Sequence, residues 1–385
     1  MKRRRIFFGL LLLCLVFFIA PAQFVAAETG EVTDVMKSFN YADGSFKMSY
    51  RLYVPEGAEN SGRQYRLVMF LHGAGERGRD NERHVTMGEG FIETMIFTEP
   101  YRSDTIVFAP QCPENYRWVE RDWSPGEYKM TAEISPALGA AIRILNEEIV
   151  PNYSVDTSRL YITGLSMGGM GTWDCIARFP GMFAAAAPVC GAPPAGMLNE
   201  LAKTPIWTCN DPSDSVIDPT PTVKKIEQLA QIGADVCYKT YTAGGNGHAS
   251  WVGAYRTDTA SDNLYAFLFS KQGTKYTVTL EDGGEQVVLG EFARGMTVEL
   301  PAPQGNAESF LGWTDGNNTY PAGGRISVTG EIVLKAVREK SRLLPILLIV
   351  GAGILLAGGV FAVVLLRKKK IKTKDDRAKR RMDTD

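Results

Sequence analysis

One serine in the chain stands in a setting that favours nucleophilic chemistry. Ser166 is flanked by glycines in the pattern Gly164-x-Ser166-x-Gly168, after an apolar, β-prone run at 160–162 and before a segment with a helical pattern. A sharp strand-to-helix turn of this kind exposes a serine hydroxyl and needs glycine at the flanking positions. The N-terminus of the following helix would favour a developing oxyanion. A glycine-rich turn with an idle serine is the alternative interpretation.

The base for such a serine must come from a short list, because the chain has only three histidines. His72 follows an apolar strand inside a glycine-rich loop. His84 lies in a charged loop beside Arg83, and we expect it to be a solvated surface group. His248 follows the glycine-rich loop 244–247, after the last expected strand. That loop would let His248 reach across the top of a sheet to the serine, so His248 is the candidate base.

Backbone N–H groups are expected to hold the oxyanion that forms when Ser166 attacks an acyl carbon. The loop 72–78 (HGAGERG) follows an apolar strand, and N–H groups near Gly73 and Ala74 would form one half of an oxyanion hole. The N–H of Met167, directly after the serine, would form the other half. A plain glycine loop is the alternative for 72–78.

Three tryptophans are candidates for the lining of a substrate pocket. Trp118 and Trp123 lie in the loop 110–126, which follows an expected strand at 105–109. A loop after the C-terminal end of a parallel strand lies over the ligand crevice. Ordinary loop packing is the alternative for both. Trp251 lies three residues after His248.

The elements that must position these residues alternate between strand and helix. Strands are expected within 31–54 (two strands) and at 66–71, 105–109, 160–162, 183–189, 204–208 and 236–241, and helices at 130–150, at 223–232 and within 248–271. This alternation predicts an α/β protein with a doubly wound, mainly parallel sheet.

The two ends of the chain predict export and membrane attachment. Residues 1–27 have the basic start, apolar run and small-residue end of a signal peptide, with an uncleaved anchor as the alternative. The uncharged run 343–366 is long enough to span a bilayer, and the basic residues 367–370 would keep the tail 367–385 in the cytoplasm. A buried core helix is the alternative for that run. A single-pass protein of the bacterial cell membrane, with its body outside, is therefore expected.

The composition of the body excludes some partners. Residues 28–341 carry 27 basic and 39 acidic residues, which argues against nucleic acid. Five cysteines follow the expected signal peptide without metal-type spacing, and we expect buried, inert thiols. No metal or other cofactor is implied.

Five motifs in order resemble a known family over residues of about 45–272. They are 71–78 (LHGAGERG), 109–113 (APQCP), 163–169 (TGLSMGG), 188–191 (PVCG) and 247–251 (GHASW). On these motifs the chain resembles the secreted α/β-hydrolases described as predicted peptidases or phospholipase/carboxylesterase-like esterases. Polyhydroxybutyrate-depolymerase-like and feruloyl-esterase-like enzymes are among the relatives by resemblance.

The resemblance implies a triad of Ser166 as nucleophile, His248 as base and an aspartate after the seventh strand. Members usually read His-Gly-x-x-Asp-x-Val-x-Pro there, whereas residues 210–219 of this chain read NDPSDSVIDP. Laid on that pattern without gaps, Asp214 falls on the acid. Asp211 and Asp218 are the alternatives, because all three follow the same expected strand.

A second, weaker resemblance covers the segment after the expected hydrolase domain. Within 275–338, the runs 275–280 (KYTVTL), 298–301 (VELP) and 310–314 (FLGWT) resemble an internalin-B-type β repeat. Alternation and turn glycines independently predict a small all-β module. A spacer or stalk is the favoured role, and a sugar- or wall-binding module is the alternative.

These inferences divide the chain into a signal peptide (1–27), an α/β-hydrolase catalytic domain (28–272), a β module (273–339), a transmembrane helix (343–366) and a cytoplasmic tail (367–385). The expected function is a membrane-tethered extracellular serine hydrolase for carboxylic esters, including esters linked to polysaccharide. A peptidase of prolyl-oligopeptidase type and a non-catalytic surface adhesion protein are the alternatives.

Overall fold

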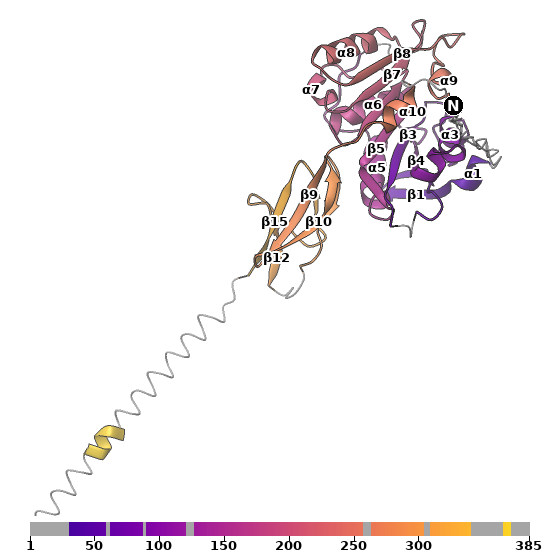
Figure 1. The fold of residues 1–385 in the computed structure, drawn as a ribbon. Coiled ribbons are helices and arrows are strands. Elements are labelled where there is room, and N and C mark those ends of the chain that lie inside the picture. The colour runs from indigo at the N-terminus through magenta and orange to yellow at the C-terminus, as the bar shows by residue number, and fades with distance from the viewer. Residues whose placement is uncertain are drawn as a thin grey trace, which may run out of the picture.

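The computed structural model describes residues 31–58, 62–87, 90–120, 127–256, 263–303, 309–339 and 365–370. Within them, a large sheet carries helices on both faces, and a smaller β structure follows it along the chain (Figure 1). The expected signal peptide (1–27) lies outside the described residues, and so does most of the tail after Leu366.

The large sheet has eight strands in the order β1-β2-β4-β3-β5-β6-β7-β8. The strands β1 and β2 pair antiparallel, β2 pairs antiparallel with β4, and the neighbours from β4 to β8 are parallel. Their bounds are β1 Lys37–Asp43, β2 Phe46–Tyr53, β3 Tyr65–Leu71, β4 Thr105–Gln111, β5 Val155–Leu165, β6 Ala185–Val189, β7 Ile206–Asn210 and β8 Val236–Thr240. The mainly parallel α/β sheet agrees with the alternation of the sequence.

Short and medium helices connect the strands. Their bounds are α1 Val32–Val35, α2 Arg83–Thr86, α3 Phe91–Phe97, α4 Tyr101–Asp104, α5 Pro136–Ile144, the π-helix η1 Leu145–Ile149, α6 Met167–Arg178, α7 Leu198–Leu201, α8 Thr220–Gln231, α9 Trp251–Ala254 and α10 Leu264–Phe269. The helix expected at 130–150 begins only at Pro136. Ser135 caps it, since its hydroxyl accepts a hydrogen bond from the Leu138 N–H, and proline suits the first helical turn.

The central strand β3 is buried on both faces, as its near-continuous apolar sequence predicts. Leu67, Met69 and Leu71 pack with α5 and α6 in one core cluster, whereas Val68 and Phe70 pack with α3 and α10 in another. Each face of the sheet is therefore covered, and the carboxyl ends of the parallel strands are left to carry a site.

The β module, defined here as residues 275–338, contains a five-stranded sheet in the order β10-β9-β15-β12-β13 and a two-stranded sheet of β11 and β14. Their bounds are β9 Lys275–Asp282, β10 Glu285–Ala293, β11 Thr297–Glu299, β12 Phe310–Thr314, β13 Thr319–Tyr320, β14 Arg325–Ser327 and β15 Ile332–Arg338. A small core forms around Trp313, Val278 and Leu334.

The β module packs against the amino-terminal end of β5 (Figure 1). The Thr157 hydroxyl donates a hydrogen bond to the Glu291 carbonyl, and Arg325 pairs with Glu147 of η1 at 2.6 Å. Ala293 and Met296 of the module are buried in the core cluster of the large sheet. The module and the large-sheet domain therefore share part of one apolar core.

The described residues contain no helix with the length and apolar character needed to cross a membrane. Of the run 343–366 that was predicted to span one, only Leu365 and Leu366 are among them.

Candidate active site

Ser166 lies at the turn between β5 and α6, at the carboxyl edge of the sheet. Its backbone has φ 53° and ψ −115°, a region that non-glycine residues rarely adopt. The Ser166 N–H donates to the Val189 carbonyl at 3.0 Å, which fixes the turn to the neighbouring strand β6. Backbone strain of this kind persists only where the surroundings hold it in place.

The flanking glycines are required by close backbone contacts. A Cβ atom on Gly168 would lie 1.8 Å from the Leu71 carbonyl oxygen, and one on Gly164 would lie 2.6 Å from the same atom. At Gly169 it would lie 2.3 Å from the Val189 oxygen. The turn is therefore pressed between the ends of β3 and β6, which accounts for the glycine pattern around the serine.

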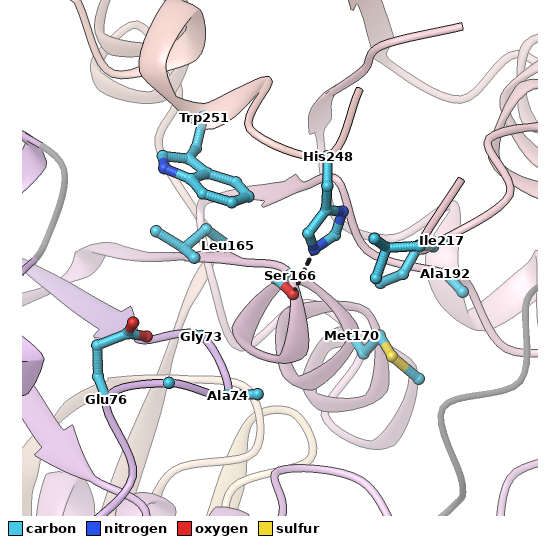
Figure 2. A pocket seen from close by; sticks show the side chains of 12 residues that line it. Gly73, Ala74, Glu76, Leu165, Ser166, Met170, Ala192, Ile217, His248 and Trp251 are labelled. Atoms are coloured by element: carbon cyan, nitrogen blue, oxygen red, sulfur yellow. Dashed lines mark hydrogen bonds between the residues drawn. The ribbon is translucent and has the colours of Figure 1, made fainter. Parts of the chain in front are cut away.

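His248 forms hydrogen bonds with both Ser166 and Asp214. Its Nε2 lies 2.8 Å from the Ser166 Oγ (Figure 2). Its Nδ1 lies 2.9 Å from the Asp214 Oδ2. Because a carboxylate only accepts hydrogen bonds, Nδ1 carries the proton and Nε2 is left to accept the serine proton. Asp214 is inaccessible to solvent in its side chain, and its Oδ1 accepts from the Val216 and Ile217 N–H groups.

The other two aspartates of this loop are engaged elsewhere. Asp211 Oδ2 accepts from the Ala243 N–H at 2.6 Å, and its Oδ1 accepts from Ser213. These bonds, first the one from Ala243, lower the pKa of Asp211. Asp218 accepts a hydrogen bond from the Thr220 N–H at the start of α8. Of the three candidates, Asp214 is the carboxylate in contact with His248.

A pocket of about 300 Å³ opens above the serine. Its lining combines the serine and histidine with the loop after β3 and with apolar side chains (Figure 2). It is lined by Gly73, Ala74, Gly75, Glu76, Leu165, Ser166, Met170, Ala192, Val216, Ile217, His248 and Trp251. The expected oxyanion residues Gly73 and Ala74 thus lie in the same pocket as the serine. Met167 is the first residue of α6, where N–H groups have no partner within the helix.

His72 supports the loop that carries Gly73. Its Nδ1 donates to the Gly73 carbonyl at 2.6 Å, its Nε2 accepts from the Cys112 N–H at 2.9 Å, and its own carbonyl accepts from the Trp118 indole N–H at 3.0 Å. Burial lowers the pKa of His72 to about 4, so the ring is neutral near pH 7. It holds the backbone of the loop in place, and it is not among the residues that line the serine pocket.

The predicted pocket role of Trp118 is wrong. Its side chain is fully buried and lies beneath the loop 72–78, in edge contact with His72. A Cβ on Gly171 would lie 2.6 Å from the Trp118 Cβ, so this tryptophan packs closely against α6. Trp123 lies outside the described residues. Trp251 does line the pocket, with its ring edge-on to His248 at 5.3 Å.

The expectation that His84 is a solvated surface group is also wrong. His84 is completely buried, its Nε2 lies 3.1 Å from the Ala109 carbonyl, and its ring lies 6.0 Å from that of His72. Burial lowers the pKa of His84 to about 3. The charged neighbours Glu82 and Arg83 are exposed, but the short helix α2 buries His84 together with Val85.

Several pocket residues carried no recognisable sequence signal. Leu165 and Met170 lie close to Ser166 in the sequence, but only the fold shows that they line the pocket. Glu76 is different, because it stands inside the glycine-rich loop that was already singled out. Of the five cysteines among the described residues, four are buried and Cys237 is half-buried.

The chain is similar in sequence to a known depolymerase and in structure to a known esterase. It is 26% identical over 206 residues to poly(3-hydroxyalkanoate) depolymerase C of Paucimonas lemoignei, covering 53% of this chain and 44% of the depolymerase. A solved thermostable esterase matches with a TM-score of 0.54 and 34% identity, covering 63% of this chain and 64% of the esterase. The chain therefore spans less than two thirds of either protein. No family model matches it.

The mostly parallel sheet and the likeness to the esterase are consistent with an α/β-hydrolase fold. One relative is named as a depolymerase and the other as an esterase, which is consistent with a serine hydrolase. The likeness of the β module to an internalin-type repeat stays a prediction.

Proposed function

We propose that the chain is a serine hydrolase that cleaves carboxylic esters through an acyl-enzyme. The observation that carries the proposal is the continuous hydrogen-bonded series from Ser166 through His248 to Asp214, next to a pocket with apolar walls. A serine alone is a weak nucleophile, and an adjacent, oriented imidazole is what activates it.

In the proposed reaction, the Ser166 oxygen attacks the acyl carbon while its proton passes to His248 Nε2. The carbonyl oxygen becomes an oxyanion beside the N–H groups of Met167 and of the Gly73–Ala74 loop. The tetrahedral intermediate collapses, the ester C–O bond breaks, and His248 protonates the departing alcohol. Water then attacks the acyl-enzyme by the same route and regenerates the serine. Asp214 holds the histidine tautomer and stabilises the imidazolium.

The proposal includes the setting of the enzyme. The apolar run 343–366 followed by basic residues supports a single membrane span, and the signal-like residues 1–27 support export of the body. We therefore infer a hydrolase outside the cell membrane, acting on ester substrates that include those attached to polymers. The named activities of the depolymerase and the esterase support ester over amide substrates.

The test is covalent labelling of Ser166 together with substrate turnover. The parent protein should react with a fluorophosphonate probe and hydrolyse short-chain p-nitrophenyl esters. Ser166→Ala should not react with the probe. Its hydrolysis of the esters should fall to a residual rate that is roughly 10³–10⁴-fold above the rate in water. An unlabelled parent would point to a non-catalytic surface protein. Turnover of short peptides without turnover of esters would replace the esterase by a peptidase.

A further inference from the structure

A second pocket lies at the junction of the large-sheet domain and the β module (Figure 1). One of its lining residues, Gly273, donates its N–H to the Ser158 carbonyl near the amino end of β5, whereas Ser166 follows the carboxyl end of that strand. The pocket has a volume of about 200 Å³, which is room for a small ligand. We call it the junction pocket, and its polar lining side chains are Lys203, Gln272, Thr274, Tyr276 and Arg294.

The junction pocket carries two positive charges without a counter-charge in the described part of the chain. Its described lining includes no acidic residue. Within the same described ranges, neither the Lys203 ammonium nor the Arg294 guanidinium makes an ion pair or a hydrogen bond. Acidic side chains of neighbouring segments are paired with other cations: Asp156 with Arg159 at 2.9 Å, Asp235 with Lys271 at 2.7 Å and Glu291 with Lys275 at 3.3 Å. Because acidic residues outnumber basic ones over 28–341, this local excess of positive charge indicates a site for an anion.

The backbone around Arg294 is held firmly in place. Ala293 and Met296, on either side of it in the sequence, are buried in the core cluster of the large sheet, and the Gly295 N–H donates to the Val328 carbonyl at 2.7 Å. The pocket is therefore largely formed before a ligand arrives, which lowers the entropic cost of binding.

The two cations approach each other at Gly181, another lining residue. A Cβ atom on Gly181 would lie 3.8 Å from the Arg294 Cδ and 3.9 Å from the Lys203 carbonyl oxygen. The stem of Arg294 and the backbone of Lys203 thus lie on either side of this glycine. One small anion in the junction pocket is within reach of both side chains.

We propose that the junction pocket binds a phosphate group, as inorganic phosphate or as the phosphate ester of a small soluble molecule. The planar guanidinium of Arg294 matches two phosphate oxygens, and the Lys203 ammonium adds a point charge. The Thr274 hydroxyl and the Gln272 amide supply further donors. Phosphate carries nearly two negative charges near pH 7.5, so it balances both cations, whereas a carboxylate balances one. The site is separate from the serine and does not depend on the proposed hydrolysis.

The direction of the module strands favours a soluble ligand over a lipid headgroup. The strand β9 begins at Lys275, beside the junction pocket, and β15 runs parallel to it. At the far end of β15, Arg338 donates to Asp282 at the far end of β9. The chain therefore leaves the module roughly 25 Å from the pocket, at about 3.3 Å per strand residue. A membrane reached through residues 343–366 would lie beyond that exit, too far for its headgroups to enter the pocket.

The experiment is calorimetric titration of the purified full chain with inorganic phosphate and with glycerol 1-phosphate at pH 7.5, with NaCl holding the ionic strength constant. The proteins are the parent, Arg294→Gln, Lys203→Gln and Lys224→Gln. Lys224 is an exposed lysine of α8 outside the junction pocket, so it controls for the loss of one positive charge. At least one of the two probes should bind the parent saturably, with one site per chain.

For that probe, Arg294→Gln and Lys203→Gln should each raise Kd about tenfold or more, because each removes a charge-assisted contact. Lys224→Gln should keep Kd within about twofold of the parent, because an exposed charge at a distance is screened. Lys203 is exposed and lies outside the core, so its variant decides the matter if Arg294→Gln fails to fold. No saturable binding of either probe to the parent, or equal Kd values in all four proteins, would overturn the inference.

A second arm separates the soluble ligand from a lipid headgroup. The full chain is placed in nanodiscs of phosphatidylcholine alone or with phosphatidic acid, and the Kd of the bound probe is measured in both. We expect the two values to agree within about twofold, because the pocket lies beyond the reach of the lipid surface. A tenfold higher Kd with phosphatidic acid, absent from Lys203→Gln, would assign the site to a lipid headgroup and overturn the choice of a soluble ligand.

Discussion

At the scale of the residue, the role of each aspartate follows from the hydrogen bonds that its oxygens already accept. Asp214 Oδ1 accepts from two backbone N–H groups, and Oδ2 is left to face His248. Both carboxylate oxygens of Asp211 accept hydrogen bonds, one from the Ala243 N–H and the other from the Ser213 N–H. Asp211 therefore ties the loop after β7 to the loop after β8, while Asp214 faces the histidine.

We expect Asp214→Asn to lower kcat by roughly 10⁴ without unfolding the protein, because the amide cannot stabilise the imidazolium and favours the wrong tautomer. Asp218→Asn should leave kcat close to that of the parent. Asp211→Asn should mainly lower the thermal stability of the loops. Measuring kcat and Tm for the three variants checks this, and a near-normal kcat for Asp214→Asn would show that the acid lies elsewhere.

The two buried histidines make the stability of the fold depend on pH. Burial lowers the pKa of His72 to about 4 and that of His84 to about 3, against about 6.5 in an unfolded chain. Below pH 6.5 the unfolded chain binds protons that the folded chain does not, so the free energy of unfolding falls as the pH falls. This contribution is complete above pH 6.5.

Between pH 7 and pH 5, each of these histidines should remove roughly 2 kcal/mol from the free energy of unfolding. We expect His84→Gln to make the pH dependence over this range shallower by about that amount, whatever its effect at pH 7. Urea titrations of the parent and the variant at both pH values measure the difference. Parallel pH profiles would mean that His84 titrates normally in the folded protein.

At this scale the sequence allowed some assignments and not others. Ser166 could be predicted because close backbone contacts require glycine at the positions around it. His248 could be predicted because the chain has only two other histidines. His84 and Trp118 were misplaced because the polarity of sequence neighbours does not determine which side a single side chain faces. The pocket wall at Met170 and Ile217 depends on contacts between distant segments, which one sequence does not reveal.

At the scale of the element, two loops bring the acid and the base together. The Ser215 N–H donates to the Asn246 carbonyl, and the Asn246 side chain accepts from the His248 N–H. Gly247 lies between Asn246 and His248 in the sequence and has φ 77°. A Cβ atom on Gly247 would lie 2.6 Å from the Asp214 nitrogen. The contact between Asp214 and His248 therefore depends on the absence of a side chain at Gly247.

We expect Gly247→Ala to lower kcat by about 10²-fold or more, since small displacements of reacting groups have effects of this size. Gly245→Ala is the matched control, because Gly245 also has a positive φ, 56°, but open space around its Cβ position. Both variants carry a similar backbone strain, so their difference in kcat isolates the collision with Asp214. Equal losses in the two variants would contradict this account.

The order of strands and helices was accessible from the sequence because apolar runs and periodic segments alternate cleanly. The start of α5 was less accessible. Apolar residues continue upstream of Pro136, whereas the Ser135 cap and the proline determine where the helix begins. The π-helix η1 that follows α5 has no simple sequence signal.

At the scale of the whole molecule, the β module packs against the large-sheet domain. Met296 is buried in the core cluster of the large sheet, and the Glu291 carbonyl of β10 accepts a hydrogen bond from the Thr157 hydroxyl at the amino end of β5. Burial of a side chain such as Met296 contributes roughly 1.5–3 kcal/mol. The hydrolase-like body is therefore stabilised by residues that follow it in the sequence.

We expect a chain of residues 28–272 to have a clearly lower Tm than a chain of residues 28–340, because it exposes the surface that the module covers. Within the longer chain, Met296→Ala should cost about 2–5 kcal/mol. Calorimetry of the three proteins measures this, and an equal Tm for the two chains would contradict it.

The chain 28–340 should also stay in the supernatant when the chain continuing through 341–385 sediments with membranes, which tests the proposed tether.

The direction of β5 gives the molecule two functionally separate ends. Its amino end carries the contacts of the module and its carboxyl end carries Ser166, and the residues from Thr157 to Leu165 span about 26 Å. Material joined behind the module thus approaches the protein from the end opposite the pocket. Immobilisation on a bead through residue 339 should leave the mouth of the pocket accessible, whereas coupling through the loop 244–247 should obstruct it. Residue 339 is therefore a suitable point for attaching the protein to a solid support.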